Sequence, residues 1–419
     1  MTRTRLRYLL RPREVTNRTN LQVLSVYRDY GVIPKDSRSD NFNRTPEDIT
    51  RYQEVRVGDL VVNKMKAWQG SVGISEHHGI VSPDYLVCGV DSSVNSRFMH
   101  HLLRSMRFAA EFGARSKGIR PAQWRLYWED LAEIPITLPP IDEQRRIADF
   151  LDAEMARIDE LTRLRRDQLT LLSTQYASAI SELVTPGITS KAERSAAWPW
   201  LPSGIRTARL GYMACMQSGI TVDSGRQSKP DNVEYPYLRV ANVQGEEIDL
   251  SEIKTITVPE STAKRSMLSS GDILMTEANG NPDNLGRGAV WHGQVAAMVH
   301  QNHIFAIRVN PKKLIPEYLC ALLASVHGRR YFRFTSTQVG IATTSSSKVL
   351  DFPVPVLTLE RQREIVRAYQ DTRSANNRVV AVLTRQLNLM AERRQALITA
   401  AVTGSLDVTT AGVLQSDED

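Results

Sequence analysis

The sequence has few cysteines and no long apolar run, and these absences exclude several classes of protein. Its 419 residues contain three cysteines, Cys88, Cys215 and Cys320, each more than a hundred positions from the next. Cysteines spaced in this way indicate neither a disulfide framework nor a CxxC metal motif. No apolar stretch reaches the roughly 18 residues of a membrane helix, and the opening segment lacks a signal-peptide core. We therefore expect a cytoplasmic protein.

Motifs of common enzymes are absent or incomplete. There is no Walker A sequence, and no glycine-rich cofactor turn follows a clear strand. Pro230-Asp231 followed by residues 252–254, "EIK", has the spacing of a metal-dependent nuclease, but the pattern is short and its first part lies in loop-like sequence. Residues 280–284, "GNPDN", lack the second proline and the aromatic residue of an adenine methyltransferase motif. We expect no catalytic residue, no metal and no cofactor.

Two histidines, His300 and His303, are three positions apart in the stretch "HQNH". The apolar residues on both sides predict one continuous strand. Positions three apart on a strand point to opposite faces, so a zinc site is not expected there. The alternatives are local hydrogen bonding at a strand edge and contact with nucleic acid.

One segment of the sequence occurs twice. "IPITLPPIDEQRRI" begins at Ile134, and "FPVPVLTLERQREI" begins at Phe352, 218 positions later. "VGDLVV" near residue 57 matches "SGDILM" near residue 270, and "KGI" at 117–119 matches "VGI" at 339–341. Identical residues at the offset of 218 include Pro135 and Pro353, Gln144 and Gln362, and Ile147 and Ile365. The chain is therefore a tandem duplication of one unit with a globular part and a helix.

Each repeat ends in a long segment without helix breakers. Residues 141–185 and 356–403 contain neither proline nor glycine, and a helix of that length reaches about 65 to 70 Å. Apolar residues at three- and four-residue spacing give each helix a seam that needs a partner. We expect the two helices to pack against each other antiparallel; the alternative is that each folds back on its own globular part. The predicted packing residues are Ile147, Leu151, Ile158, Leu161, Leu172, Tyr176, Ile365, Tyr369, Leu383, Leu387, Met390 and Leu397.

The sequence resembles the specificity (S) subunit of type I restriction-modification systems over nearly its whole length. Residues 235–243 "YPYLRVANV", 270–281 "SGDILMTEANGN" and 300–309 "HQNHIFAIRV" resemble the family's target recognition domain. Residues 58–75 "GDLVVNKMKAWQGSVGIS" resemble a second version of it, and 138–152 "LPPIDEQRRIADFLD" is similar to the conserved helical region. The first repeat departs from the second at its opening, where "RLRYLLRPRE" replaces "RLGYMACMQSGITV" and a longer insertion.

The resemblance implies an α+β fold with two mixed α/β target recognition domains. They are expected to be related by pseudo-twofold symmetry and separated by a coiled coil of two long antiparallel helices. The expected parts are recognition domain 1 at 1–140, a spacer helix at 141–186, recognition domain 2 at 187–356, a second spacer helix at 357–405 and a disordered acidic tail at 406–419.

The resemblance also implies a function. Such subunits are not catalytic, and they bind a bipartite double-stranded DNA target with one recognition domain on each half. Their helices act as a spacer that docks two methyltransferase (M) subunits and, in the larger assembly, restriction (R) subunits. Two other classes stay open at this point, an enzyme that itself cleaves or methylates DNA and a coiled-coil interaction module whose charge serves solubility.

A formal charge of +7 fits a polyanionic partner. Lys and Arg bind phosphates, while Arg, Asn, Gln, Ser and Thr read base edges. In the first recognition domain the predicted DNA-binding residues are Arg28, Lys35, Arg38, Lys64, Lys66, Trp68, Gln69, Arg115, Lys117 and Arg120. In the second they are Arg226, Lys229, Arg239, Asn242, Glu277, Asn279, Asn281, Arg287, Arg329, Arg330, Arg333, Gln338, Ser345, Ser346, Ser347 and Lys348. The alternatives are a solvated loop with a core tryptophan at residues 63–71 and capping or pairing within the sheet for Arg239 and Asn242.

Overall fold

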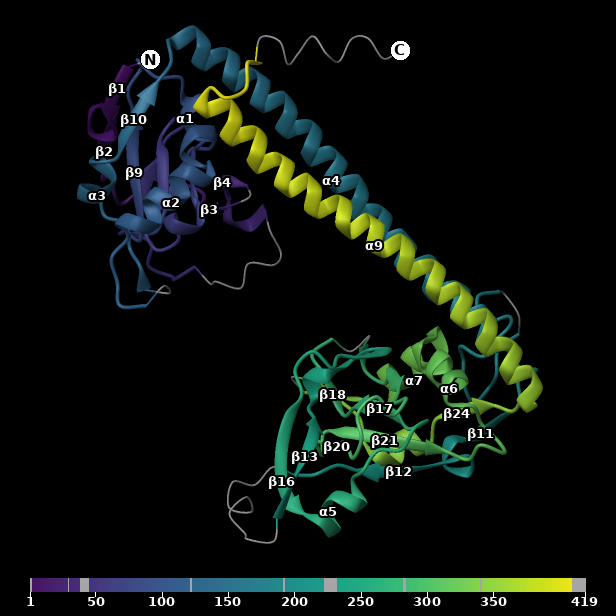
Figure 1. Cartoon of the computed structure of the whole chain (residues 1–419). Coiled ribbons are helices and arrows are strands. Elements are labelled where there is room, and N and C mark those ends of the chain that lie inside the picture. The colour runs from purple at the N-terminus through teal and green to yellow at the C-terminus, as the bar shows by residue number, and fades with distance from the viewer. Residues whose placement is uncertain are drawn as a thin grey trace. The chain divides into compact units, whose positions relative to one another are not determined.

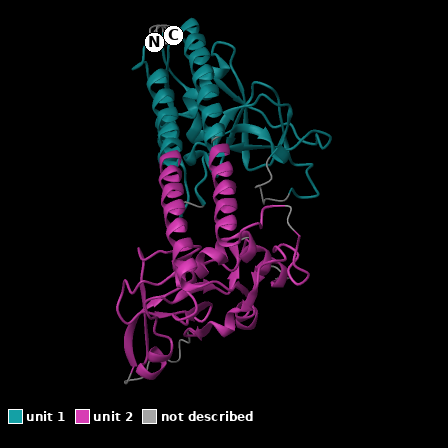
Figure 2. Cartoon of the chain, turned by 90° about the vertical axis from the view of Figure 1, so that its right-hand side faces the viewer, with its two compact units in different colours: residues 1–166, 384–419 teal, residues 167–383 magenta. Residues whose placement is uncertain are grey.

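The computed structural model divides into two compact units, coloured separately in Figure 2. Unit 1 comprises residues 1–166 and 384–419, and unit 2 comprises residues 167–383. Both boundaries fall inside long helices, so each unit contains a piece of α4 (Ile141–Val184) and a piece of α9 (Leu359–Thr403). The structure describes residues 2–28, 30–37, 45–120, 123–190, 193–221, 232–281, 284–339 and 341–408.

Unit 1 is built on an antiparallel four-stranded sheet with the strand order β2-β9-β6-β7, and helices α1 and α2 pack beside it (Figure 1). The strands are rich in β-branched and apolar residues, which favour a buried sheet. Its elements are β1 (Thr2–Arg5), η1 (Leu6–Tyr8), β2 (Leu10–Pro12), β3 (Leu24–Tyr27), β4 (Gly31–Pro34), η2 (Lys35–Ser37), β5 (Gln53–Val55), β6 (Leu60–Asn63), η3 (Ala67–Gln69), β7 (Val72–Ile74), β8 (Gly79–Val81), β9 (Tyr85–Val90), α1 (Ser96–Leu103), α2 (Met106–Arg115), α3 (Trp128–Ala132) and β10 (Pro135–Leu138).

Unit 2 repeats this plan with the strand order β12-β21-β17-β19 and adds the three-stranded sheets β16-β13-β20 and β18-β23-β22. Its elements are β11 (Thr207–Arg209), η5 (Leu210–Tyr212), β12 (Ala214–Ser218), β13 (Asn232–Leu238), η7 (Val240–Asn242), β14 (Val243–Gln244), β15 (Glu247–Ile248), β16 (Lys254–Pro259), α5 (Glu260–Arg265), β17 (Ile273–Thr276), β18 (Ala278–Asn279), β19 (Gly288–Val290), β20 (Val299–His300), β21 (Ile304–Val309), α6 (Pro316–Ala324), α7 (Val326–Thr335), β22 (Thr337–Val339), β23 (Ile341–Thr343), α8 (Ser346–Leu350) and β24 (Pro353–Pro355).

The two openings that differ in sequence form the same strand pair. In unit 1, β1 pairs antiparallel with β10, and Arg5 lies opposite Pro135. In unit 2, β11 pairs antiparallel with β24, and Arg209 lies opposite Pro353. The next residue of each opening donates its backbone N–H to the first residue of the repeated segment, from Leu6 to Ile134 O at 3.1 Å and from Leu210 to Phe352 O at 2.9 Å. The departure at the first opening therefore leaves this strand pair unchanged.

The repeated glutamine explains why the segment at the start of each long helix occurs twice. In unit 1, Gln144 Oε1 accepts the Asn95 backbone N–H at 3.0 Å, and its amide donates to Pro139 O at 2.9 Å. In unit 2, Gln362 Oε1 accepts the backbone N–H of Ile315 at 2.9 Å, and its amide donates to the carbonyl of Leu357 at 3.1 Å. Asn95 and Ile315 are the N-caps of α1 and α6. Each glutamine thus joins the start of a long helix to the start of the first helix of its globular part.

The long helices pack against each other within each unit, as the apolar seams predict. In unit 1, α4 contacts α9 from Glu154, whose carboxylate is 3.4 Å from the Arg393 guanidinium, to Thr162, whose hydroxyl is 3.7 Å from the sulfur of Met390. The residue numbers of the contacts fall along α9 as they rise along α4, so the two helices are antiparallel, as Figure 1 shows. Among the described residues, no helix combines the length and the hydropathy needed to cross a bilayer.

The predicted packing residues differ in how far they are buried. Leu161 is 39% exposed, and the prediction is wrong for it because it shares the outward side of α4 with Leu164, which is 43% exposed. The buried members are Ile147, Leu151, Ile158, Ile365, Tyr369 and Leu383, and the half-buried members are Leu172, Tyr176, Leu387, Met390 and Leu397.

Unit 2 contains a buried histidine that makes its stability depend on pH. His327 Nε2 donates to Pro353 O at 2.7 Å, and its Nδ1 accepts the Trp200 indole N–H at 3.0 Å, so the neutral ring is fully satisfied. Burial lowers the pKa of His327 from 6.5 to about 4. The neutral ring therefore stabilises unit 2 fully above pH 6.5, and this contribution is lost as the pH falls from 6.5 towards 4.

We expect the free energy of unfolding of unit 2 to fall by about 2 kcal/mol between pH 7.5 and 5 through His327 alone. Urea titrations followed by tryptophan fluorescence at the two pH values measure this change. A His327→Gln chain should lose this part of the pH dependence. A His292→Gln chain, altered at an exposed histidine, should keep it. Equal pH dependence in both variants would contradict the assignment.

Candidate nucleic-acid interface

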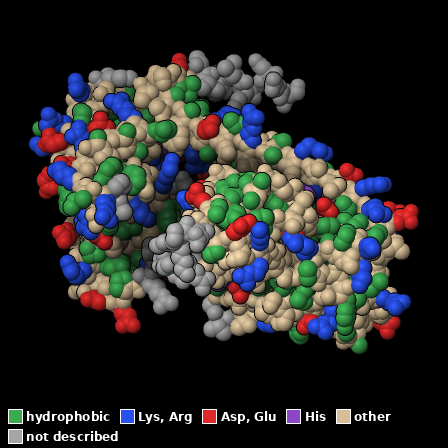
Figure 3. Space-filling view, turned by 60° about the horizontal axis from the view of Figure 1, so that its bottom comes forward, with side chains coloured by type: hydrophobic (Ala, Val, Ile, Leu, Met, Phe, Trp, Pro, Cys, Tyr) green, Lys and Arg blue, Asp and Glu red, His purple; other side chains and the backbone are tan. Residues whose placement is uncertain are grey.

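Charge alone does not locate a binding surface on this protein. On the face shown in Figure 3, Lys and Arg side chains are interspersed with acidic and apolar side chains rather than gathered in one patch. The interface has to be found from the geometry of the predicted residues.

A rigid loop in unit 1 presents two lysines. The loop, residues 63–70, follows β6, and Asn63 Oδ1 accepts the backbone N–H of Met65 at 3.1 Å and of Lys66 at 3.2 Å. The Trp68 indole N–H donates to Met65 O at 3.1 Å, and a left-handed glycine, Gly70 with φ +86°, closes the turn. The tryptophan therefore positions the loop, while the side chain of Lys66 is exposed. We call residues 63–70 the lysine loop.

A hairpin packs against the lysine loop. Lys117 and Arg125 form an antiparallel bridge with two backbone hydrogen bonds of 2.9 Å. One residue further on, the Leu126 N–H donates to Lys64 O at 2.9 Å, which ties the hairpin to the lysine loop. Arg120 lies exposed between the bridged residues. We call residues 117–120 and 123–125 the first hairpin.

Unit 2 has the same arrangement at the equivalent positions. The β22–β23 hairpin, which we call the second hairpin, pairs with β18 and thereby joins the segment that follows β17. The Thr344 N–H donates to Glu277 O at 2.9 Å. Thr344 is the repeat position of Leu126 at an offset of 218, and Glu277 is that of Lys64 at the offset of 213 that relates the two "GD" motifs. Each unit therefore packs a hairpin on the segment that leaves its central sheet.

The second surface carries polar side chains together with lysine and arginine. Asn279 Oδ1 accepts the backbone N–H of Asn281 at 2.9 Å, and Lys348 Nζ donates to Thr337 Oγ1 at 3.4 Å. The Tyr331 hydroxyl donates to Lys348 O at 2.6 Å, which brings α7 and its exposed arginines beside α8. The predicted residues that these contacts bring to the second surface are Glu277, Asn279, Asn281, Arg330, Arg333, Ser345, Ser346, Ser347 and Lys348.

The other predicted residues of unit 1 lie in several places. Arg28 lies beside the lysine loop, because a Cβ on Gly70 would meet its Cγ at 3.9 Å. The Arg115 Nε donates to Glu111 at 3.2 Å, and Lys117 Nζ donates to Asp130 at 2.8 Å. Lys35 lies at the far end of the β3–β4 hairpin, where its Nζ donates to Thr45. The predicted residues outside the described part of the chain are Arg38, Arg226 and Lys229, as is the side chain of Gln338.

The prediction is wrong for Asn242. Its side chain is 4% exposed, its amide donates to the carbonyls of Asp249 at 2.8 Å and Glu252 at 3.0 Å, and its Oδ1 accepts the Arg239 N–H at 2.9 Å. The asparagine holds the turn around η7 together and is not available to DNA. Arg239 forms an ion pair with Glu252 at 3.5 Å. Both residues follow the alternative of capping and pairing within the protein.

Two other predicted residues also contact protein. Arg287 is half-buried beside Gly245, and Arg329 Nε donates to Ala324 O at 3.1 Å.

The expectation of one continuous strand through "HQNH" is wrong. His300 ends β20, Gln301 forms an isolated bridge with Ile220, a turn follows at 302–303, and β21 begins at Ile304 in a different sheet. His300 is buried, whereas His303 is exposed and lies 2.7 Å from Glu277 Oε2.

Sequence reasoning missed a contact between the β14–β15 turn and both long helices in unit 2. Glu246 accepts hydrogen bonds from the hydroxyls of Tyr369 on α9 and Tyr176 on α4. Arg373 donates to the Glu246 carbonyl and to Glu247 Oε1, both at 3.1 Å. Burial raises the pKa of Tyr176 to about 12, so it remains a donor. The two tyrosines stood out as seam residues, but no pattern in "QGEEI" indicated their partner.

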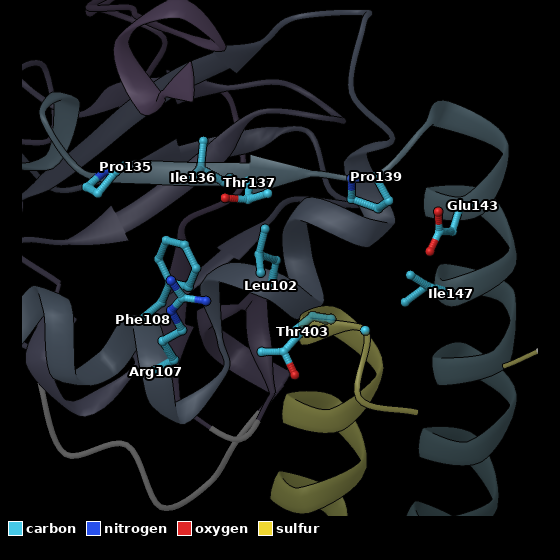
Figure 4. A pocket seen from close by; sticks show the side chains of 12 residues that line it. Leu102, Arg107, Phe108, Pro135, Ile136, Thr137, Pro139, Glu143, Ile147 and Thr403 are labelled. Carbon is cyan, nitrogen blue, oxygen red and sulfur yellow. The ribbon is translucent and has the colours of Figure 1, made fainter. Parts of the chain in front are cut away.

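A pocket of about 210 Å³ lies where unit 1 joins its helices. Figure 4 shows Phe108 of α2, Ile136 of β10 and Ile147 of α4 around it, with Thr403 at the end of α9. In unit 2 the neighbourhood of the equivalent position contains Trp200, bound to His327. The pocket is a junction between packed elements and contains no cluster of reactive groups.

The described residues contain no group of three or more His, Cys, Asp or Glu side chains that could hold a metal ion. Glu252 of the nuclease-like spacing forms ion pairs with Lys254 at 2.7 Å and with Arg239, and Asp231 lies outside the described residues. Residues 409–419 of the predicted acidic tail also lie outside them, while Leu406 and Val408 pack against the unit 1 core.

Comparisons with known proteins agree on one family. The model of the type I restriction modification DNA specificity domain matches residues 91–171. The EcoKI specificity subunit of Escherichia coli (strain K12) is 26% identical over 381 residues, which cover 84% of this chain and 77% of that protein. The StySPI specificity subunit of Salmonella potsdam is 23% identical over 376 residues, which cover 84% of this chain and 77% of that protein.

The fold is similar to a solved chain from work on complex assembly and conformational transition of the type I R-M system. The TM-score is 0.71 at 18% identity, and the match covers 97% of this chain and 98% of that chain. The shared fold agrees with the two globular parts and two long helices described above. In sequence and in fold, the chain is similar to the specificity subunits of type I restriction-modification systems.

Proposed function

We propose that this chain is a specificity subunit that binds a bipartite double-stranded DNA target, with the lysine loop and first hairpin on one half and the second hairpin surface on the other. The observation that carries the proposal is that one arrangement is built twice with unlike side chains. Backbone bonds of 2.9 Å fix both hairpins at equivalent positions. The first surface carries Lys64, Lys66 and Arg120, and the second carries Asn279 and Lys348. Unlike surfaces on a shared scaffold suit two half-sites of different sequence.

The long helices support a role as spacer. At 1.5 Å per residue, the 44 residues of α4 extend about 66 Å, close to two turns of B-form DNA. We propose that this length sets the number of base pairs between the half-sites. Deleting one heptad from each helix should then change the preferred spacing or prevent assembly.

Exposed apolar residues support a role as scaffold. Leu161, Leu164 and Leu171 are 39%, 43% and 70% exposed on α4. Residues at these spacings share one side of a helix. An apolar side of a helix that is exposed in the described part of the chain is typical of a surface that binds another protein. Their repeat equivalents on α9, each 218 positions later, are Val379, Val382 and Leu389, at 47%, 56% and 51% exposed. A docking stripe present twice suits two copies of one partner, and we propose the two methyltransferase subunits, with restriction subunits joining the larger assembly.

Methylation mapping in cells tests the proposal most directly. Cells with the methyltransferase partner should methylate one bipartite sequence only when this chain is present. The purified chain alone, given magnesium or a methyl donor, should neither cleave nor methylate DNA. Its DNA binding should weaken steeply with added salt, which a module using its charge only for solubility would not show. Methylation of the same sites without the chain would overturn the proposal.

A further inference from the structure

Two isoleucines project from the equivalent hairpins of the two units. Ile119 on the first hairpin is 95% exposed, and Ile341 at the start of β23 on the second hairpin is 57% exposed. Single exposed apolar residues are common on protein surfaces and need no explanation by themselves. Here the same residue type occupies the same hairpin in both repeats, within the matched stretches "KGI" and "VGI".

The two isoleucines lie on different limbs of their hairpins. Ile119 follows Lys117, which is bridged to Arg125, on the first limb, whereas Ile341 begins the second limb opposite Val339. Each hairpin is held to the segment leaving the central sheet by one of the two equivalent 2.9 Å bonds to Lys64 O and Glu277 O. Both isoleucines therefore stand on a rigid support, which a residue that distinguishes bases requires.

The neighbouring side chains show what such a residue would meet. Ile119 lies between Lys117 and Arg120 in the chain, and the second hairpin is joined to Lys348 through the Thr337 hydroxyl. Cations bind phosphates and carry no sequence information, whereas an apolar side chain has no favourable contact with a phosphate. On DNA, its partners are the thymine methyl group and the faces and edges of bases.

We propose that Ile119 and Ile341 are specificity-determining residues that contact bases, one in each half of the target. This inference rests on the proposed function, because it assigns a role within the same two surfaces. The flanking cations hold each hairpin against the backbone of its half-site, and the isoleucine then contacts a base that the cations cannot distinguish.

Two single variants, Ile119→Ser and Ile341→Ser, test the proposal in the full chain assembled with its methyltransferase partner. The probes are fluorescent duplexes with the mapped target, with either half scrambled, and with both halves scrambled. Each variant should bind the target about 10-fold more weakly, as expected for one lost base contact. Ile119→Ser should reduce the effect of scrambling one half by about 10-fold, and Ile341→Ser that of scrambling the other.

Binding to the fully scrambled duplex and its salt dependence should not change in either variant, because the phosphate contacts are intact. Val233→Ser, at a position on β13 that is 49% exposed, is the matched control and should behave as the unaltered chain. Unchanged discrimination in both isoleucine variants, or equal weakening on all duplexes, would overturn the inference while leaving DNA recognition in place. An unaltered complex without sequence preference would overturn the proposed function and this inference together.

Discussion

A chain with aspartate at Leu164 and Val382 is expected to bind the methyltransferase subunit at least about 100-fold more weakly than the unaltered chain, because each substitution would bury an unpaired charge in a docking stripe. The two residues are repeat equivalents and are 43% and 56% exposed, so the free chain should fold normally. Co-purification and native mass spectrometry measure the number of partner subunits bound.

The two single variants test whether each stripe binds one partner subunit. Leu164→Asp or Val382→Asp alone should leave one partner subunit bound instead of two, because each stripe serves one copy. Ser173→Asp is the control, since Ser173 is an exposed residue of α4 on the side away from Leu164. Two partner subunits on the double variant would show that the stripes do not dock them.

A chain with alanine at Arg330 and Lys348 is expected to bind every duplex about 10- to 100-fold more weakly near 0.15 M salt, whatever its sequence. Both residues belong to the second surface, where α7 and α8 meet through the Tyr331 hydroxyl. If both cations bind phosphates, the slope of log affinity against log salt should become shallower by about 2. Fluorescence anisotropy over a salt series gives both quantities.

The control for this pair carries the same change of charge elsewhere in unit 2. Lys264 and Arg265 end helix α5, and Lys264 pairs with Glu260 at 2.7 Å. A Lys264→Ala, Arg265→Ala chain should keep nearly all of its affinity. Equal losses in the two double variants would mean that net charge, rather than the second surface, determines binding.

The repeat let the sequence predict the fold in considerable detail. Gln144 and Gln362 were visible as identical residues, and the structure gives them the same hydrogen bonds at the start of α4 and α9. The helix bounds followed from the absence of proline and glycine, because a long breaker-free segment with an apolar seam has few other ways to fold. α9 ends at Thr403, one residue before Gly404 with φ +75°, a conformation that favours glycine.

The candidate site was less visible, because its contacts depend on residues whose positions only the fold sets. Asn242 is a polar residue next to an arginine, and its burial depends on the carbonyls of Asp249 and Glu252 seven and ten residues later. The equivalence of the two hairpins rests on backbone bonds to Lys64 and Glu277, two residues of opposite charge. A comparison of the side chains at those two positions could not have paired them.

Each unit completes its core with helix from the other half of the sequence. Ile398 and Ala401 of α9 belong to the core of unit 1, and Ile180 and Val184 of α4 belong to that of unit 2. A half-length chain could bury its core only by exchanging helices with a second copy. Such a homodimer would carry two identical hairpins and would be restricted to palindromes, whereas fusing the halves frees each hairpin to diverge independently.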